Sequence, residues 1–533
     1  MDRRTFLSLS GATLLHGPLA EGEAPQSAVA PPVKPYRPAS KVNIVMLMAD
    51  QHRWDCMGAY GNKAIHTPNM DRIAREGVVF ENAYSSTPSC TPARSALMTG
   101  RSPWGHGMLG YGTIATNLYP TEKATAMAQA GYYTTSVGKN HYYPITNPHG
   151  YHHLVNDEHC TYWFHKGDGK HAQSAEPRCD YESWFWSQMP DKDPHATGLG
   201  WNDRSSKPFA YPEEMHATHW TGETAVRFLQ QYERDEPFFL KVSFIRPHSP
   251  YDAPERFFRM YEHDLPKTAV GDWAKKYEPH SSERDDLWHG KFSDEEIHKS
   301  RQGYYAGVSF VDEQIGRILR VLEQRGMLDN TMIVYFSDHG DMLGDHNMWR
   351  KSYAYESSAH IPMLVRPAKS QRLQVAGKRM SQVVEIRDLL PTFLDAAGAA
   401  IPADVEGKSM LALLRGEAEW REYLDLEHAI TYDPSNHWTA LTDGKWKYIF
   451  HCYDGSEQLF QLTEDRAELH DLSADAAHAD TLAMWRSRMA KHLEVRGPHW
   501  VQDGKPAIRK GNDLYSPNFP GYSKEIPLLS WAG

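Results

Sequence analysis

The chain has 533 residues, of which 40% are hydrophobic, and a formal net charge of −11. This length and a mean hydropathy of −0.63 are typical of a large soluble globular protein with room for a sizeable core and two domains. The acidic balance and the lack of a basic run exclude a nucleic-acid surface. Five cysteines are too few for a disulfide framework, although Cys160 and Cys179 could pair within one loop.

The first residues are typical of an export signal. Arg3 and Arg4 precede a short apolar run, which gives the segment a twin-arginine appearance. This run is too short to cross a bilayer, and no later segment has the pattern of a membrane span. We therefore assign residues 1–38 to an export signal and linker, and we predict a periplasmic or secreted protein.

Apolar strands and helices alternate over the next part of the chain. The run 42–48 has the length and composition of a strand buried in a parallel sheet. The pattern also predicts strands over 78–83, 132–137, 238–244, 331–336 and 360–365, and helices over 67–77, 93–98, 121–131, 218–231, 301–327 and 385–397, the last with a kink at Pro391. We expect an α/β domain over residues 39–420, built on a large, mostly parallel sheet flanked by helices.

The pattern changes after residue 420. Residues 438–449 are typical of a hairpin around Asp443-Gly444, and a strand over 457–462 and a helix over 476–495 follow. We therefore predict a smaller α+β subdomain with an antiparallel sheet, together with a tail, over residues 421–533.

Residues 144–212 are rich in aromatic residues and histidines and show no sustained period. Long irregular segments inside a domain are usually functional or disordered, and the aromatic content argues against disorder. We interpret the segment as an insertion that covers a binding site. Its histidine and cysteine spacings match no standard zinc pattern, so a second metal site is not favoured.

Polar side chains gather where the predicted strands end. These residues are Asp50 and Gln51, Lys139 and His141, His248, and Asp338 and His339, with Lys351 on a later loop. Ligand groups collect at the carboxyl ends of strands in open α/β sheets. If the strands before Asp50 and Asp338 are neighbours, their side chains form a mixed oxygen and nitrogen site for a divalent cation, and oxygen ligands favour Ca²⁺ or Mg²⁺. His141 and His248 are candidate acid and base.

Cys90 stands immediately before a helical pattern, with Pro92 in the first turn and Arg94 one turn on. A helix N-terminus with an arginine can hold a tetrahedral oxyanion. The alternative from these residues alone is a buried cysteine before an ordinary helix. The sequence has no Walker loop, no dinucleotide fingerprint at a strand–helix junction, no Gly-x-Ser-x-Gly elbow and no His-Glu-x-x-His, so those reaction classes lose weight.

Cys90-Thr91-Pro92-Ala93-Arg94 resembles the sulfatase signature Cys-x-Pro-x-Arg, and Thr99-Gly100-Arg101 continues it. The resemblance extends over most of residues 41–475 and includes, in order, Ala49-Asp50-Gln51, Gly138-Lys139-Asn140-His141, Arg246-Pro247-His248, Ser337-Asp338-His339-Gly340-Asp341, Lys351 and Leu459-Phe460-Gln461-Leu462. It implies an alkaline-phosphatase-like fold and a sulfuric ester hydrolase.

The resemblance also implies roles for the residues. A formylglycine-generating enzyme would oxidise Cys90 to formylglycine, whose hydrated form attacks sulfur and later expels sulfate. The implied catalytic residues are Cys90, Arg94, Lys139, His141, His248 and Lys351, with His248 as acid towards the leaving alcohol and His141 as base. The implied ligands of Ca²⁺, or of Mg²⁺ or Mn²⁺, are Asp50, Gln51, Cys90, Asp338 and His339.

Three positions depart from the sulfatase pattern. Many sulfatases have aspartate where this chain has Gln51, asparagine where it has His339, and arginine where it has His360. The first two resemble some phosphonate or phosphodiester hydrolases of the same superfamily. We therefore keep three functions: a sulfatase acting on a sulfated carbohydrate or aryl sulfate ester, a phosphonate monoester or phosphodiester hydrolase, and a non-catalytic protein that binds sulfated glycans.

Overall fold

The structure is a computed structural model that describes residues 41–112, 114, 119–158, 179–195, 197–263 and 265–522. Its main sheet has eight strands in the order β4-β3-β5-β1-β6-β7-β2-β8 within these residues. Their bounds are β1 Asn43–Asp50, β2 Val78–Tyr84, β3 Tyr133–Gly138, β4 His153–Asn156, β5 Phe238–Pro247, β6 Thr331–Ser337, β7 Met363–Arg366 and β8 Lys378–Glu385. Strands β4, β3, β5, β1 and β6 run parallel, whereas β7 is antiparallel to both β6 and β2. The predicted large, mostly parallel sheet is confirmed.

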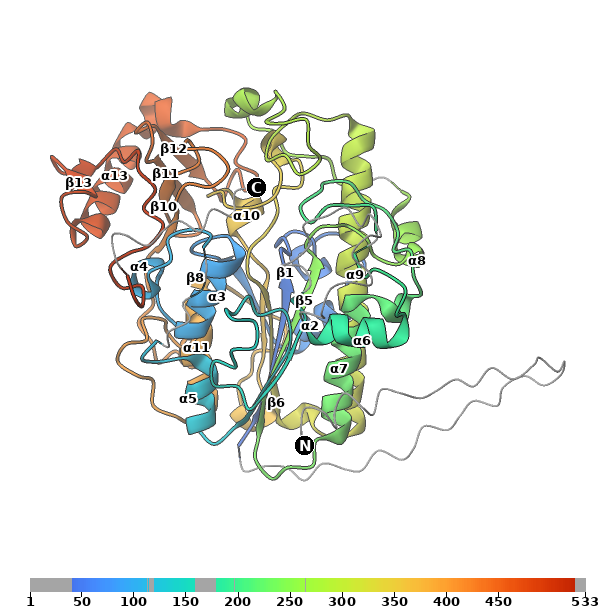
Figure 1. Ribbon diagram of the computed structural model, residues 1–533. Helices are drawn as coiled ribbons and strands as arrows, with labels where there is room; N and C mark the ends of the chain where they lie inside the picture. The colour runs from blue at the N-terminus through green and yellow to red at the C-terminus, as the bar shows by residue number, and fades with distance from the viewer. Residues whose placement is uncertain are drawn as a thin grey trace, which may run out of the picture.

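Helices cover both faces of this sheet, as Figure 1 shows. On one face lie α3 Cys90–Thr99, α5 Lys123–Gln129, α11 Leu389–Ala396 and α12 Met410–Arg415, and on the other lie α2 Pro68–Glu76, α7 Ala217–Gln231 and α9 Asp294–Gln324. Strand β1 is buried on both sides: Met46 packs towards the first set of helices and Leu47 towards the second. This explains why its sequence is a continuous apolar run rather than an alternation.

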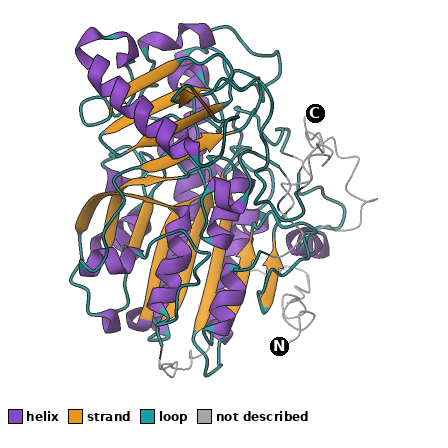
Figure 2. Cartoon of the chain, turned by 90° about the vertical axis from the view of Figure 1, so that its left-hand side faces the viewer, coloured by secondary structure: helices purple, strands orange, loops and turns teal. Residues whose placement is uncertain are grey.

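A second sheet follows in the chain, with the antiparallel order β12-β11-β10-β9. Its strands are β9 Leu424–His428, β10 Trp438–Thr442, β11 Trp446–His451 and β12 Glu457–Gln461, and α13 Ala479–Glu494 packs on one face. The other face contributes to an apolar cluster with Tyr84 and Val383 of the main sheet. In Figure 2 this sheet lies beyond one end of the main-sheet strands. The antiparallel subdomain is confirmed as a fold, and its boundary at residue 420 stays a prediction.

The remaining elements are short. They are α4 Pro103–His106, α6 Asp180–Gln188, α8 Glu255–Phe258, α10 Glu356–Ala359, β13 Val501–Gln502 and β14 Lys505–Pro506. Among the described residues, no helix combines the length and the apolar character that a membrane crossing requires.

Several local predictions were wrong or incomplete. The segment 144–212 is not wholly irregular, because β4 joins the edge of the main sheet and α6 follows it. The helix expected over 385–397 begins only at Leu389, after the unpredicted strand β8, and Pro391 lies in its first turn rather than at a kink. Strand β9 and helix α12 were also not predicted. The proposed Cys160–Cys179 pair involves Cys160, which lies outside the described residues, as do residues 1–38.

Candidate active site

The strand ends meet at one edge of the main sheet. Strand β1 pairs in parallel with β5 on one side and with β6 on the other, and β3 lies beyond β5. The carboxyl ends of parallel strands lie at the same edge, so Asp50, Lys139, His248 and Asp338 come together there. The condition that the strands before Asp50 and Asp338 are neighbours is met.

Helix α3 brings Cys90 to this edge. The helix begins at Cys90, all ten of its residues are buried, and it ends at Gly100 in a left-handed conformation with φ of 67°. The Cys90 Sγ lies 3.2 Å from Nε2 of His339 and 3.8 Å from Oδ1 of Asp50. The cysteine therefore faces the strand-end residues from the N-terminus of a buried helix.

Arg94, one turn along α3, joins the two carboxylates. Its guanidinium donates to Asp50 Oδ2 at 3.1 Å and to Asp338 Oδ2 at 2.9–3.1 Å. It also donates to the backbone carbonyl of Lys139 at 2.8 Å and to the hydroxyl of Ser243 at 3.2 Å. The arginine thus spans the ends of four strands and offsets the charge of two fully buried acids.

Two lysines stand beside these acids. The Nζ of Lys139 lies 2.5 Å from Asp50 Oδ2. The Nζ of Lys351 donates to Gln51 Oε1 at 2.7 Å and lies 2.5 Å from Nε2 of His248. The other ring nitrogen of His248 lies 2.7 Å from the carbonyl of Ser249, which can only accept, so it carries the proton and Nε2 accepts from Lys351.

Gln51 and His141 both hold left-handed backbone conformations, with φ of 69° and 60°. The Gln51 amide donates to Asp341 Oδ2, so both ends of this side chain are hydrogen-bonded. The backbone N–H of His141 donates to Glu158 at 2.8 Å, while its Nδ1 is buried with no hydrogen-bond partner among the described residues. His141 therefore lies beside the cluster without a direct bond to it.

The charges of the site shift several pKa values. Burial alone would raise the pKa of Asp50, but the positive charges of Lys139 and Arg94 hold it well below its usual range. Burial and Asp50 likewise act to raise the pKa of the Cys90 thiol, yet Lys351, Lys139 and His339 bring it below its ordinary value. For His248, burial and then Lys351 hold the pKa of the imidazole well below 6.5. The site thus combines an ionised buried acid with neutral imidazole at His248.

A four-residue cluster has the donor atoms of a metal site. One ligand atom from each of Asp50, Cys90, Asp338 and His339 lies within 4.8 Å of the others, and all four residues are buried. Buried carboxylates need compensation by cations. The two carboxylates of this set suit a divalent ion, and the imidazole and the softer thiol are its nitrogen and sulfur donors. Gln51 is adjacent, but its oxygen accepts from Lys351.

Some residues of the site were not found from the sequence. Trp201, from the segment 144–212, stacks on His248 with ring centroids 4.1 Å apart and lies 5.1 Å from Nζ of Lys139. No local pattern marks such a tryptophan. His360, in contrast, stacks between Trp54 and Tyr84 rather than facing the cluster. The histidine at this position, where many sulfatases have arginine, therefore contributes to aromatic packing.

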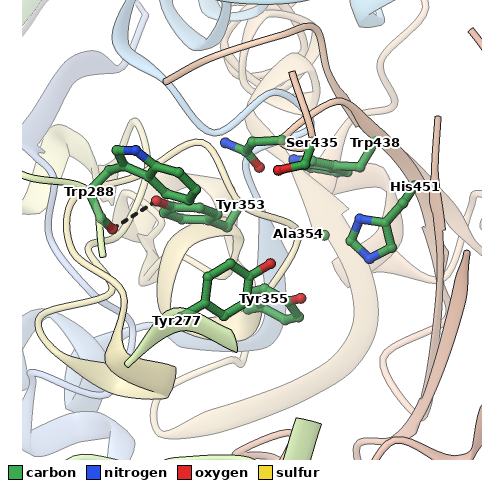
Figure 3. A pocket seen from close by; sticks show the side chains of 9 residues that line it. Tyr277, Trp288, Tyr353, Ala354, Tyr355, Ser435, Trp438 and His451 are labelled. Atoms are coloured by element: carbon green, nitrogen blue, oxygen red, sulfur yellow. Dashed lines mark hydrogen bonds between the residues drawn. The ribbon is translucent and has the colours of Figure 1, made fainter. Parts of the chain in front are cut away.

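A pocket is lined in part by residues that follow Lys351 in the sequence. Figure 3 shows its aromatic walls; the lining residues are Tyr277, Trp288, Tyr353, Ala354, Tyr355, Ser435, Asn436, Trp438 and His451. Asn436 and Trp438 donate to the carbonyl of Ser352, which follows Lys351 directly. The second sheet therefore forms one wall of an aromatic pocket and contacts the loop that carries Lys351.

Family models and known proteins agree with this architecture. The sulfatase model matches residues 42–399, and a model described as N-sulphoglucosamine sulphohydrolase, C-terminal, matches residues 344–495. An arylsulfatase of Clostridium perfringens is 37% identical over 469 residues, which are 87% of this chain and 97% of that one. An N-acetylglucosamine-6-O-sulfatase of Bacteroides thetaiotaomicron is 29% identical over 82% of this chain and 83% of its own length.

Solved structures share the fold. A protein solved in complex with its substrate D-glucosamine-2-N,6-O-disulfate superposes with a TM-score of 0.68 at 23% identity, covering 85% of this chain and 98% of that one. A phosphonate monoester hydrolase of Agrobacterium radiobacter gives 0.67 at 23% identity, over 88% and 100%. The fold is thus one that solved sulfatases and phosphonate monoester hydrolases share. The chain belongs to the sulfatase family and is a sulfatase, an enzyme that hydrolyses sulfate esters.

Proposed function

We propose that this sulfatase uses residue 90 as its nucleophile after a formylglycine-generating enzyme has oxidised the Cys90 side chain. The observation that carries the proposal is the position of Cys90: it is buried at the N-terminus of α3, 3.2 Å from His339 and 3.8 Å from Asp50. Hydrated formylglycine supplies a hydroxyl that takes up the sulfuryl group and a second hydroxyl that allows sulfate to leave by elimination. A thiol would instead be trapped as a stable ester.

The residues around position 90 fit a divalent cation. Asp50, Asp338, His339 and residue 90 would hold it, and Gln51, whose amide oxygen accepts from Lys351, would offer a further oxygen ligand. The two hard carboxylates favour Ca²⁺, with Mg²⁺ or Mn²⁺ as alternatives. Such an ion supplies electrostatic stabilisation to an attacking oxygen and to the sulfuryl oxygens.

The other side chains bind charge and move protons. Arg94, Lys139 and Lys351 place three positive charges against the two carboxylates, which leaves an excess for an anionic sulfate group. Lys351 donates to Nε2 of His248, so the pair can deliver a proton to the departing alcohol. Nδ1 of His141 has no hydrogen-bond partner in the described part of the chain, which suits it to accept a proton as sulfate is released.

For the substrate, we favour a carbohydrate sulfate, with aryl sulfates as an alternative. Trp201 beside His248 and the aromatic pocket lined by Tyr353 and Tyr355 supply flat apolar faces on which sugar or aryl rings can stack. Among the relatives, the names arylsulfatase and N-acetylglucosamine-6-O-sulfatase represent both substrate classes.

We also propose that the enzyme is exported, from the arginine pair at Arg3 and Arg4 and the apolar run after it. Replacing both arginines by lysine should retain the protein in the cytoplasm, as judged by cell fractionation. Unchanged export of this variant would contradict a twin-arginine route.

Mass spectrometry of the Cys90 peptide tests the mechanism. We expect the mass of formylglycine in active enzyme, and Cys90→Ala should abolish turnover of aryl sulfates. Asp338→Ala should lose bound metal and activity together. Full activity of Cys90→Ala, or an unmodified thiol in fully active enzyme, would contradict the proposal. Initial rates on matched aryl sulfate, N-acetylglucosamine 6-sulfate, phosphonate and phosphodiester substrates then rank the substrate classes.

A further inference from the structure

Ser89, the residue before the proposed nucleophile, makes an unusual contact for its position. Its backbone is extended, with φ of −151° and ψ of 159°, as expected at a helix N-cap, yet its side chain accepts no hydrogen bond from the helix. The hydroxyl instead lies 2.9 Å from Nε2 of His428, which belongs to β9 in the second sheet. A residue far away in the sequence therefore holds the N-terminus of α3.

The direction of this hydrogen bond follows from the other side of the ring. Nδ1 of His428 lies 2.7 Å from the carbonyl of Ala429, which can only accept, so Nδ1 carries the proton. Nε2 is then an acceptor, and the Ser89 hydroxyl donates to it. His428 is 1% exposed, and burial lowers the pKa of its imidazole to about 4, which keeps the ring neutral near pH 7.

The backbone around His428 is hydrogen-bonded to the chain segments before and after α3. The N–H of Glu427 donates to the carbonyl of Ser86 at 2.8 Å, and the N–H of Ala429 donates to the carbonyl of Leu109 at 2.6 Å. Glu427 and His428 at the end of β9, and Ala429 just after it, thus bind the chain before α3, at its start and after its end. The imidazole reaches Ser89 from a backbone that has little freedom to move.

Glu427 anchors the same strand to the rest of the second subdomain. Its two carboxylate oxygens accept from Arg496 at 2.7 and 2.8 Å, and the Arg496 guanidinium lies over the rings of Trp104 and Trp500, 4.7 and 4.9 Å from their centroids. Trp104 belongs to α4, just after α3. The anchor therefore couples the second sheet to the helices around the nucleophile.

We propose that His428 is a positioning residue for the sulfatase reaction: by accepting from Ser89 it fixes the start of α3 and holds side chain 90 against His339 and Asp50. The inference rests on the proposed role of residue 90. A displacement of about 1 Å at a reacting group can lower the rate about 100-fold, so a single contact to the residue before the nucleophile has a large effect on turnover.

The test compares His428→Phe, which keeps a ring but removes the acceptor, with His428→Gln, which offers an oxygen in place of Nε2. His437→Phe is the matched control, because His437 is another buried histidine of the second subdomain. For each protein, kcat towards an aryl sulfate is divided by the formylglycine content from mass spectrometry, and KM is measured without this correction. Wild-type enzyme without formylglycine would contradict the proposed function itself. The kcat of each variant relative to wild type tests the role of His428 alone.

We expect His428→Phe to lower kcat by about 10- to 100-fold with little change in KM, His428→Gln to recover most of the loss, and His437→Phe to keep wild-type kcat. Ser89→Ala should cause a similar loss, and combining it with His428→Phe should add little, because both remove one hydrogen bond. Equal kcat for His428→Phe and wild type, or losses that multiply in the double variant, would overturn the proposal.

Discussion

Arg94 is the residue on which the buried charge balance of the site depends. It is 2% exposed and donates to both Asp50 and Asp338, each 0% exposed. Burial opposes its charge, but Asp338 and then Asp50 raise the pKa of the guanidinium, so it stays ionised. Only the planar fork of arginine reaches both carboxylates and the Lys139 carbonyl at once.

Arg94→Ala should therefore destabilise the enzyme as well as inactivate it. Removing one partner of a buried ion pair costs about 3–5 kcal/mol, because the other charge is left without compensation. Urea unfolding of enzyme treated with a chelator measures this loss, and Arg101→Ala, which breaks a partly exposed pair with Asp404, is the control. We expect saturating Ca²⁺ to recover part of the stability of Arg94→Ala. An Arg94→Ala enzyme as stable as wild type in chelator would contradict this account of the two acids.

The candidate residues at the strand ends could be predicted because they lie beside strong local signals. The apolar run before Asp50 indicates a buried strand, and the carboxyl ends of neighbouring parallel strands must meet. The partners of these residues had no such signal. Trp201 lies in a segment without periodicity, and His428 ends the five-residue strand β9, which sequence periodicity missed. Their roles come from long-range packing, which no local pattern encodes.

At the scale of elements, the start of α9 is marked in the sequence by a capping box. The helix was predicted from residue 301, yet it begins at Asp294, directly after a capping box. Ser293 Oγ accepts from the N–H of Glu296 at 3.3 Å, and Glu296 accepts from the N–H of Ser293 at 3.1 Å. Ser-x-x-Glu is a sequence signature of a helix start. The sequence therefore contains the information to predict that α9 begins at Asp294.

Ser293→Ala should lower the free energy of unfolding by about 1 kcal/mol, the usual cost of losing an N-cap side chain. Because the cap lies outside the candidate site, kcat should not change. Chemical denaturation measures the loss. Ser187→Ala, at an exposed position in α6, serves as the comparison and should change stability by less. A larger loss for Ser187→Ala than for Ser293→Ala would show that the capping box does not hold the start of α9.

At the scale of the whole molecule, the order of predicted elements was enough to predict the fold class, but not the complete set of strands in the main sheet. Alternating strands and helices indicated a mostly parallel sheet, and the change to hairpins indicated the antiparallel one. Strands β4 and β8 were missed because one has four residues and the other begins with a polar, partly exposed half. Both lie at the edges of the main sheet, where burial imposes the weakest pattern.

Buried neutral histidines should make the whole molecule sensitive to acid. Burial lowers the pKa of His106 to about 3 and of His346 and His428 to about 4, from 6.5. The unfolded chain therefore takes up protons below pH 6.5 that the folded chain does not accept until about pH 4, or about pH 3 at His106. Stability is complete above pH 6.5 and falls as the pH drops through this window, by up to roughly 3 kcal/mol for each histidine.

Replacing one of these histidines should make that decline shallower. His106 is suited to the test, because its Nδ1 accepts from the Met108 N–H while its Nε2 is buried with no hydrogen-bond partner among the described residues. In urea unfolding between pH 7.5 and 4.5, His106→Gln should show a smaller loss of stability with acid than wild type. His470→Gln is the matched control, since that side chain is 69% exposed and its removal should leave the slope unchanged. Equal slopes for His106→Gln and wild type would mean that His106 already binds its proton in the folded state.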